Sequence, residues 1–104
     1  MIEVLFMLKE TWPTKSSVAV GKVAVQILSM PLPSYVKMYG PFVTLGGDGI
    51  KVYTVYDAEK GHEEEWHKEL MKQQAEHFGI EGFKSSVEVV LSVQDALPLV
   101  GLSL

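Results

Sequence analysis

The stretch Gly46-Gly47-Asp48-Gly49 decides the fold, because it separates two segments rich in β-branched and aromatic side chains. Glycine adopts positive φ angles at little steric cost, and tight hairpin turns require such angles. Ser34 to Leu45 and Ile50 to Asp57 are therefore predicted to form a β-hairpin. A phosphate-binding loop is disfavoured, since such a loop leads from a strand into a helix. Gly40-Pro41 interrupts the first strand, which predicts a bulge and an edge position.

A helix is predicted on each side of this hairpin. Residues Glu59 to Phe78 carry Glu63, Glu64 and Glu65 in the first turns, where the helix dipole favours negative charge, and Gly79 suits the C-terminal end. The predicted apolar stripe of this helix is Trp66, Leu70, Met71, Ala75 and Phe78. Residues Pro13 to Met30 also show helical spacing, through Val20, Val23, Ala24, Ile27 and Leu28. Gly21 and the many β-branched residues in this segment favour a strand. The helical spacing of the apolar residues outweighs them, and a helix is predicted.

Two further strands, the first and the last along the sequence, complete the pattern. Met1 to Lys9 is apolar on both faces, which is typical of a central strand. Phe83 to Val93 alternates in the manner of a last strand. Ser92 and Asp95 have the spacing of a helix cap, and they precede a tail, Asp95 to Leu102, that is too apolar to be a free terminus.

The resulting order, β-α-β-β-α-β, resembles that of the ferredoxin-like α+β sandwiches. That resemblance implies a four-stranded antiparallel sheet with two helices on one face, formed by a single domain over residues 1–104. The chain also resembles the small dimeric α/β-barrel proteins, which pair sheet to sheet, and the segments Pro33 to Lys37 and Ile80 to Phe83 look family-like. The first and third strands are expected to be parallel neighbours, which would bring Glu3 close to Lys51.

Composition excludes several classes of function. The net charge is −4, and all nine basic residues are lysines. Because nucleic-acid binders need a basic face and favour arginine, no nucleic-acid partner is expected. The chain has no cysteine, which excludes disulfides and thiolate sites. No apolar run approaches about 20 residues, so neither a membrane span nor a membrane partner is expected, and a cytoplasmic location is predicted.

The histidines give little support for a metal site. A zinc-protease helix carries two histidines four residues apart, whereas His62 and His67 are five apart. Glu63 and His67 can meet on one helix face, but a solvated acidic face explains them better. His77, near the helix end, is predicted to stabilise the negative end of the helix dipole. No metal and no cofactor are therefore expected.

The sheet face turned away from the helices, here called the open face, is the predicted functional surface. Its apolar strand residues are interface candidates: Leu5, Met7, Tyr53, Val55 and Val90. Its candidate ligand-binding residues are Tyr35, Lys37, Tyr39, Tyr53 and Glu88. The first hypothesis is a non-catalytic, self-associating module, a homodimer that binds a small molecule at this face or between subunits. The alternative is a small α/β-barrel-type enzyme, an isomerase or a cofactor-free monooxygenase, that uses these groups for acid–base chemistry.

Overall fold

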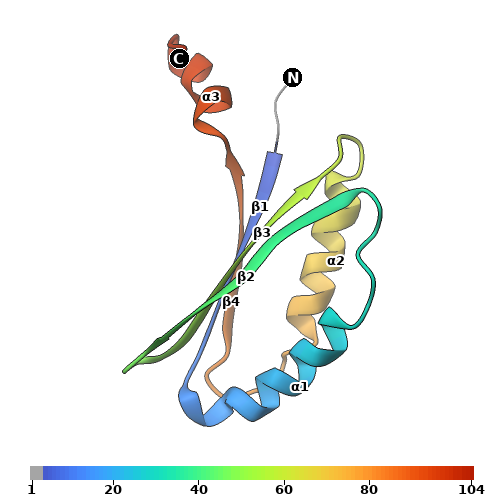
Figure 1. The fold of residues 1–104 in the computed structure, drawn as a ribbon, viewed down its shortest axis with the longest axis vertical. Coiled ribbons are helices and arrows are strands. Elements are labelled where there is room, and N and C mark those ends of the chain that lie inside the picture. Colours follow the sequence, from blue (N-terminus) through green and yellow to red (C-terminus); the bar gives the residue numbers. More distant parts are fainter. Residues whose placement is uncertain (1–3) are drawn as a thin grey trace.

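The computed structural model describes residues 4–104 and has an α+β architecture with one four-stranded antiparallel sheet and three α-helices (Figure 1). The elements in chain order are β1 (Val4–Trp12), η1 (Thr14–Ser16), α1 (Ser17–Leu28), β2 (Val36–Gly46), β3 (Gly49–Ala58), α2 (Glu63–Ala75), β4 (Lys84–Leu91), α3 (Val93–Ala96) and η2 (Leu97–Val100). The order β-α-β-β-α-β-α contains one helix more than the six-element order predicted from the sequence.

The strands lie side by side in the order β2-β3-β1-β4, and every neighbouring pair is antiparallel. The expectation that the first and third strands are parallel was wrong. In the observed register Lys51 lies opposite Thr11, near the end of β1 where the chain leaves the sheet. The expected pairing of Lys51 with residue 3 therefore has no support from the register, and Glu3 itself lies outside the described residues.

The hairpin predicted around the glycine cluster is confirmed. Strand β2 ends at Gly46 and strand β3 begins at Gly49, and Gly47 and Asp48 form the turn between them. Gly49 has a φ of 125°, and a Cβ there would collide with the carbonyl oxygen of Trp12. The register of β2 shifts between Tyr39 and Phe42, so the bulge is confirmed, and the strand order places β2 at an edge.

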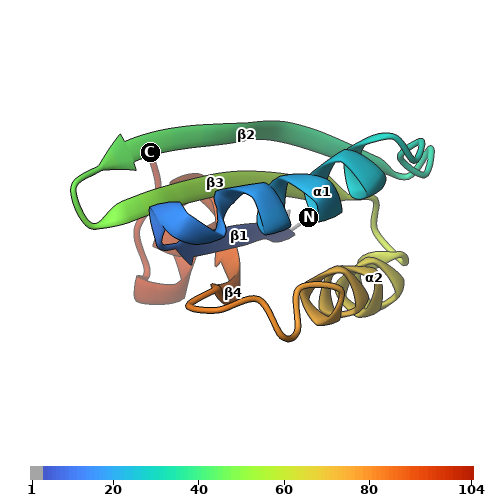
Figure 2. The same ribbon diagram turned by 90° about the horizontal axis from the view of Figure 1, so that it is seen from below.

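Both long helices cover the same side of the sheet (Figures 1 and 2). Helix α1 confirms the helical interpretation of this part of the chain, although it begins at Ser17 after a short turn of 3-10 helix. The core forms mainly between α2 and the sheet, where the Tyr56 and Trp66 rings lie 5.0 Å apart. The buried core residues are Phe6, Leu8, Val36, Tyr56, Ala58, Trp66 and Leu70.

The buried face of α2 differs from the predicted stripe. Trp66 and Leu70 are buried as predicted, but Met71 is 55% exposed and Phe78 is 83% exposed. Ala75 is exposed as well. The buried position at this end of the helix is taken by His77, which is only 5% exposed. A polar side chain therefore stands where the sequence predicted an apolar one.

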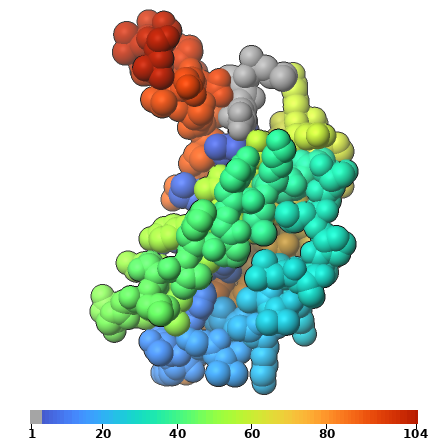
Figure 3. Space-filling model, in the orientation of Figure 1, coloured from blue at the N-terminus to red at the C-terminus, as the bar shows by residue number. Residues whose placement is uncertain are grey.

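The C-terminal segment, residues 93–104, stands away from both long helices and from the body of the molecule (Figures 1 and 3). The Ser92 side chain caps α3 by accepting a hydrogen bond from the Asp95 amide at 3.3 Å, as the sequence predicted. Leu99 and Val100 are nevertheless 70% and 72% exposed. The Cα radius of gyration is 15.5 Å, whereas a compact chain of this length has about 13 Å. The expectation that the tail is covered is not met within this chain.

Candidate functional site

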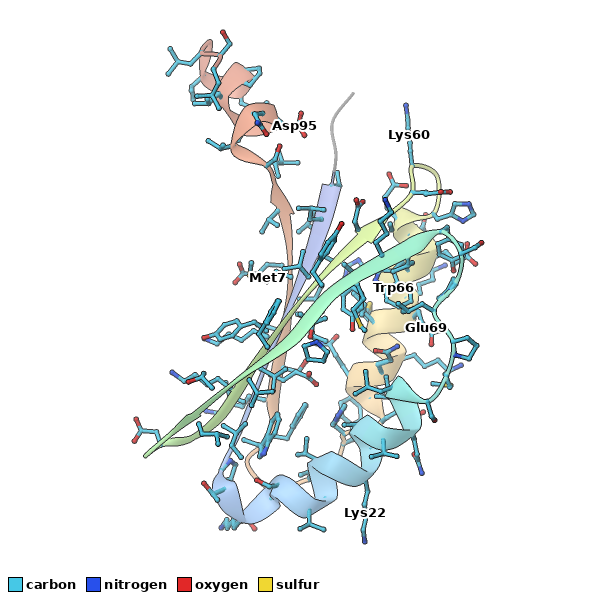
Figure 4. The ribbon with its side chains drawn as sticks, viewed as in Figure 1. Met7, Lys22, Lys60, Trp66, Glu69 and Asp95 are labelled. Atoms are coloured by element: carbon cyan, nitrogen blue, oxygen red, sulfur yellow. The ribbon has the colours of Figure 1, made fainter. Side chains whose placement is uncertain are left out.

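The apolar residues predicted for the open face share one face of the sheet. Met7 pairs with Val55 and Leu5 pairs with Val90, so these four side chains form two neighbouring rows. Figure 4 shows Met7 on the side of the sheet away from α2, and Trp66 between α2 and the sheet. Tyr53 belongs to the same face and lies opposite Phe42, which is 63% exposed.

Four of the five ligand-binding candidates also belong to the open face. Lys37 lies opposite Asp57 and Tyr39 lies opposite Val55, while Tyr53 and Glu88 pair with Lys9 and Met7. Tyr35 does not join them. Its ring stacks on the His62 imidazole with centroids 4.2 Å apart, and it packs against the core on the helix side. The structure therefore separates Tyr35 from the other four residues.

A cavity of about 190 Å³ lies on the opposite side, between α1 and the sheet. Helix α1 supplies an apolar wall, and β1 and β3 supply the floor. Five polar side chains reach this cavity: Glu10, Thr54, Tyr56, Gln73 and His77. The apolar lining includes Leu8, Trp12, Val20, Ala24, Ile27, Leu28, Pro41, Val43 and Val52.

A second, larger hollow of about 390 Å³ adjoins the cavity. The two share four lining residues: Ile27, Leu28, Tyr56 and Gln73. The larger hollow continues past Tyr35 and Met38 to Trp66 and Glu69 of α2. The shared residues make a single elongated site, apolar along most of its length, with Glu10 and His77 toward one end and Tyr35 and Glu69 toward the other.

Glu10 and His77 form the polar centre of this site. Glu10 lies on the helix side of β1, between Val52 and Ser85 on the neighbouring strands. Its Oε2 atom lies 3.8 Å from Nε2 of His77, and the two side chains are 17% and 4% exposed. Nδ1 of His77 lies 2.9 Å from the carbonyl oxygen of Gln73. Because that carbonyl can only accept, Nδ1 carries the hydrogen and Nε2 is left facing the carboxyl group.

Aromatic stacking holds the imidazole in place. The His77 and Phe83 rings are nearly parallel, at 3°, with centroids 4.2 Å apart. Trp12 stacks on the same Phe83 ring with centroids 6.1 Å apart. Gln74 also donates a hydrogen bond of 2.9 Å to the Ser85 hydroxyl, which ties the end of α2 to β4. The imidazole therefore has little freedom to turn away from Glu10.

Burial sets the protonation of the site. Removal from water raises the pKa of the Glu10 carboxyl, and His77 opposes part of that rise. Burial also raises the pKa of Tyr56 to about 12, with a smaller contribution from the nearby Glu10 charge. Tyr56 therefore remains a hydrogen-bond donor at neutral pH, while Glu10 changes protonation closer to neutrality than an exposed glutamate does.

Sequence analysis missed this site, although two signals pointed to it. Glu10 has the same parity along β1 as the buried Phe6 and Leu8, so its side chain faces the core. His77 follows Leu70 by seven residues, which returns it to the buried face of the helix. Both residues were interpreted by their polarity alone, Glu10 as the end of a strand and His77 as a partner of the helix dipole.

The remaining charged contacts are on the surface. His62 Nδ1 lies 3.1 Å from Glu65 Oε2, and Lys15 Nζ lies 2.8 Å from Glu81 Oε1. Within residues 4–104, no three histidine, aspartate or glutamate side chains gather in a way that could hold a metal ion. No helix in that range is both long enough and apolar enough to cross a bilayer.

Comparison with protein-family models, with curated proteins and with solved structures found no match to this chain.

Proposed function

We propose that this chain is a self-associating, ferredoxin-like domain that binds a small, uncharged, largely apolar molecule between α1 and the sheet. The strand order β2-β3-β1-β4, with both long helices on one face, supports the ferredoxin-like assignment. The short helices α3 and η2, which follow β4, are an addition to the ferredoxin-like order of elements. The observation that carries the binding proposal is the elongated cavity that ends at Glu10 and His77.

The size and lining of the cavity define the ligand class. Small-molecule sites are concave, mostly apolar and provided with a few polar groups that orient the ligand. The larger hollow, of about 390 Å³, falls within the range of such sites, and the smaller one, of about 190 Å³, adjoins it. An anionic ligand is disfavoured, because its charge would lie beside the buried Glu10 carboxyl and no arginine is present to balance it. An uncharged molecule avoids this repulsion.

The open face supports self-association. Tyr39, Phe42 and Tyr53 are 51%, 63% and 36% exposed on it, next to the half-buried pair Met7 and Val55. Covering each large apolar side chain gains roughly 1.5–3 kcal/mol, so pairing two such faces is strongly favoured. A dimer joined sheet to sheet, as in the dimeric α/β-barrel proteins, would cover this surface and leave the helix-side cavity free. The partner proposed here is a second copy of the chain.

Acid–base catalysis is the second candidate function. The open-face groups support it weakly, because Tyr35 lies on the other side of the sheet and Tyr39 and Tyr53 are exposed. The observation that favours catalysis is the buried contact between Glu10 and His77 at the end of an apolar cavity. Such a pair can supply the acid–base group that an isomerase or a cofactor-free monooxygenase uses.

Binding of the uncharged fluorophore N-phenyl-1-naphthylamine tests the proposed cavity. Fluorescence should rise and saturate at one probe per chain, because the probe enters an apolar site. Ala24→Trp fills the cavity from α1 and should weaken binding at least tenfold. Ala19→Trp adds the same side chain on the exposed side of that helix and is the matched control. If both variants fold by circular dichroism and bind the probe as the unsubstituted protein does, the cavity is not the binding site.

A further inference from the structure

We propose that Glu10 is the proton-transferring group of the helix-side cavity, and that the site isomerises an uncharged, enolisable carbonyl compound by a 1,3-proton shift. This inference rests on the proposed function, since it assigns a reaction to the same cavity. Glu10 would be the catalytic residue because its carboxyl lines the cavity. His77 would be a positioning residue that holds the carboxyl group in place.

The geometry of the pair positions the Glu10 carboxyl group. Nδ1 of His77 lies 2.9 Å from the Gln73 carbonyl oxygen, which fixes the ring so that Nε2 faces Oε2 of Glu10 at 3.8 Å. At that distance the imidazole positions the carboxyl group and acts on it electrostatically, without a direct hydrogen bond. A ligand in the cavity meets a carboxyl group that can both accept and return a proton.

The surroundings of Glu10 suit this chemistry. The titratable groups facing it are Tyr56 of β3 and His77 beyond α2, whereas α1 contributes only apolar side chains to the cavity. Exclusion of water strengthens electrostatic interactions there. Burial raises the pKa of Glu10, which makes its carboxylate a stronger base than an exposed glutamate. The Tyr56 phenol stays protonated and can donate a hydrogen bond to a developing enolate oxygen.

The reaction balances without a co-reactant. The Glu10 carboxylate removes a proton from the carbon between a carbonyl group and a carbon–carbon double bond. The electron pair of that C–H bond forms a new double bond, and the carbonyl π electrons move to oxygen to give a dienolate. Tyr56 donates a hydrogen bond to that oxygen. The dienolate then takes the proton back from Glu10 at its far carbon, which yields the conjugated isomer and restores the carboxylate.

The probe reaction is conversion of 3-cyclohexen-1-one to 2-cyclohexen-1-one, followed by the absorbance of the conjugated product. The protein should accelerate this reaction above the buffer rate, with kcat rising as pH increases through the raised pKa of Glu10. Glu10→Gln keeps the size of the side chain and removes the base, so kcat should fall about 100-fold or more. Glu64→Gln, at a largely exposed position of α2 outside both hollows, is the matched control and should leave the rate unchanged. Tyr56→Phe should lower kcat with a smaller effect on KM.

Two further measurements separate the possible outcomes. His77→Gln should move the pH–rate profile, which a merely structural role would not do in a variant that still binds N-phenyl-1-naphthylamine. Saturation-transfer NMR establishes whether 3-cyclohexen-1-one occupies the cavity, with Ala24→Trp as the blocked control. If the ketone binds but its rate is the same with Glu10→Gln, or does not exceed the buffer rate, the catalytic inference is overturned while the binding proposal stands. If neither probe binds at the cavity, the proposed function fails, and the catalytic inference fails with it.

Discussion

Nε2 of His77 lies 3.8 Å from Oε2 of Glu10, which joins the turn after α2 to the C-terminal part of β1 through the interior of the molecule. Such a contact places a carboxyl group where an apolar side chain would pack at lower cost. The same contact closes one end of the cavity beneath α1. Its protonation therefore links the stability of the domain to the chemistry available in the cavity.

Glu10→Gln should make the dependence of stability on pH less steep. The raised pKa means that the folded protein holds the Glu10 proton more tightly than the unfolded chain does. The free energy of unfolding therefore falls as pH rises from about 4.5, the ordinary pKa of a glutamate, through the raised pKa. Glutamine mimics the protonated acid and removes this loss. Urea denaturation at pH 4 and pH 8 should show Glu10→Gln gaining stability relative to the unsubstituted protein at the higher pH.

Glu88→Gln provides the control for that measurement, because Glu88 is exposed on β4. It should leave the pH dependence of unfolding almost unchanged. An equal response in the two variants would show that the burial of Glu10 has no energetic effect.

Leu70→Ala should destabilise the domain by about 2–5 kcal/mol. Leu70 is fully buried in the core between α2 and the sheet, and truncation leaves a cavity. The adjacent Met71 is 55% exposed, so Met71→Ala should change stability by no more than about 0.5 kcal/mol. Thermal or urea unfolding followed by circular dichroism measures both. Similar losses in the two variants would contradict the observed orientation of α2.

Gly49→Ala should cost about 1–3 kcal/mol through backbone strain, and more through collision with the Trp12 carbonyl. Gly49 has a φ of 125°, which alanine rarely adopts. Gly47→Ala is the matched control, since no atom lies within 4 Å of its added Cβ and its φ is not positive. Unfolding midpoints compare the two, and a neutral Gly49→Ala would contradict the hairpin geometry.

Val55→Lys and Tyr53→Glu should weaken the proposed dimer. Each puts a charge into the open face, where the partner sheet would otherwise exclude water. Sedimentation equilibrium at micromolar concentration should give twice the chain mass for the unsubstituted protein and a mass nearer to one chain for the variants. Val18→Lys, on an exposed position of α1, is the control and should remain dimeric. A monomeric unsubstituted protein would rule out the sheet-face interface.

The backbone plan followed from local patterns in the sequence. The glycine cluster specified the hairpin, because Gly49 adopts a φ of 125° that other residues rarely accept. The second long helix was also predicted, but α2 spans Glu63–Ala75 and is shorter at both ends than the predicted Glu59 to Phe78. The direction of the third strand relative to the first was predicted wrongly. Strand β3 follows β2 through a tight hairpin and so runs antiparallel to it. It lies between β2 and β1, which run parallel to each other, and is therefore antiparallel to β1 as well.

The cavity was harder to foresee, because it depends on contacts between residues far apart in the chain. Glu10 and His77 are ordinary surface residues by type, and only their parity and helical spacing place them inside. Phe78 illustrates the opposite error. Its apolar side chain suggested the core, yet the chain has already left α2 there, and the ring is 83% exposed.

The short helices beyond β4 should make hydrogen exchange in that segment sensitive to contact with another surface. Helices shorter than about 12–15 residues are marginal in water, and α3 and η2 have four residues each. In an isolated chain, their backbone amide hydrogens should therefore exchange with deuterated solvent within seconds. Contact with another surface would slow that exchange while the amides of the sheet changed little. The deuterium uptake of residues 93–100 thus reports whether this segment is free or bound to another surface.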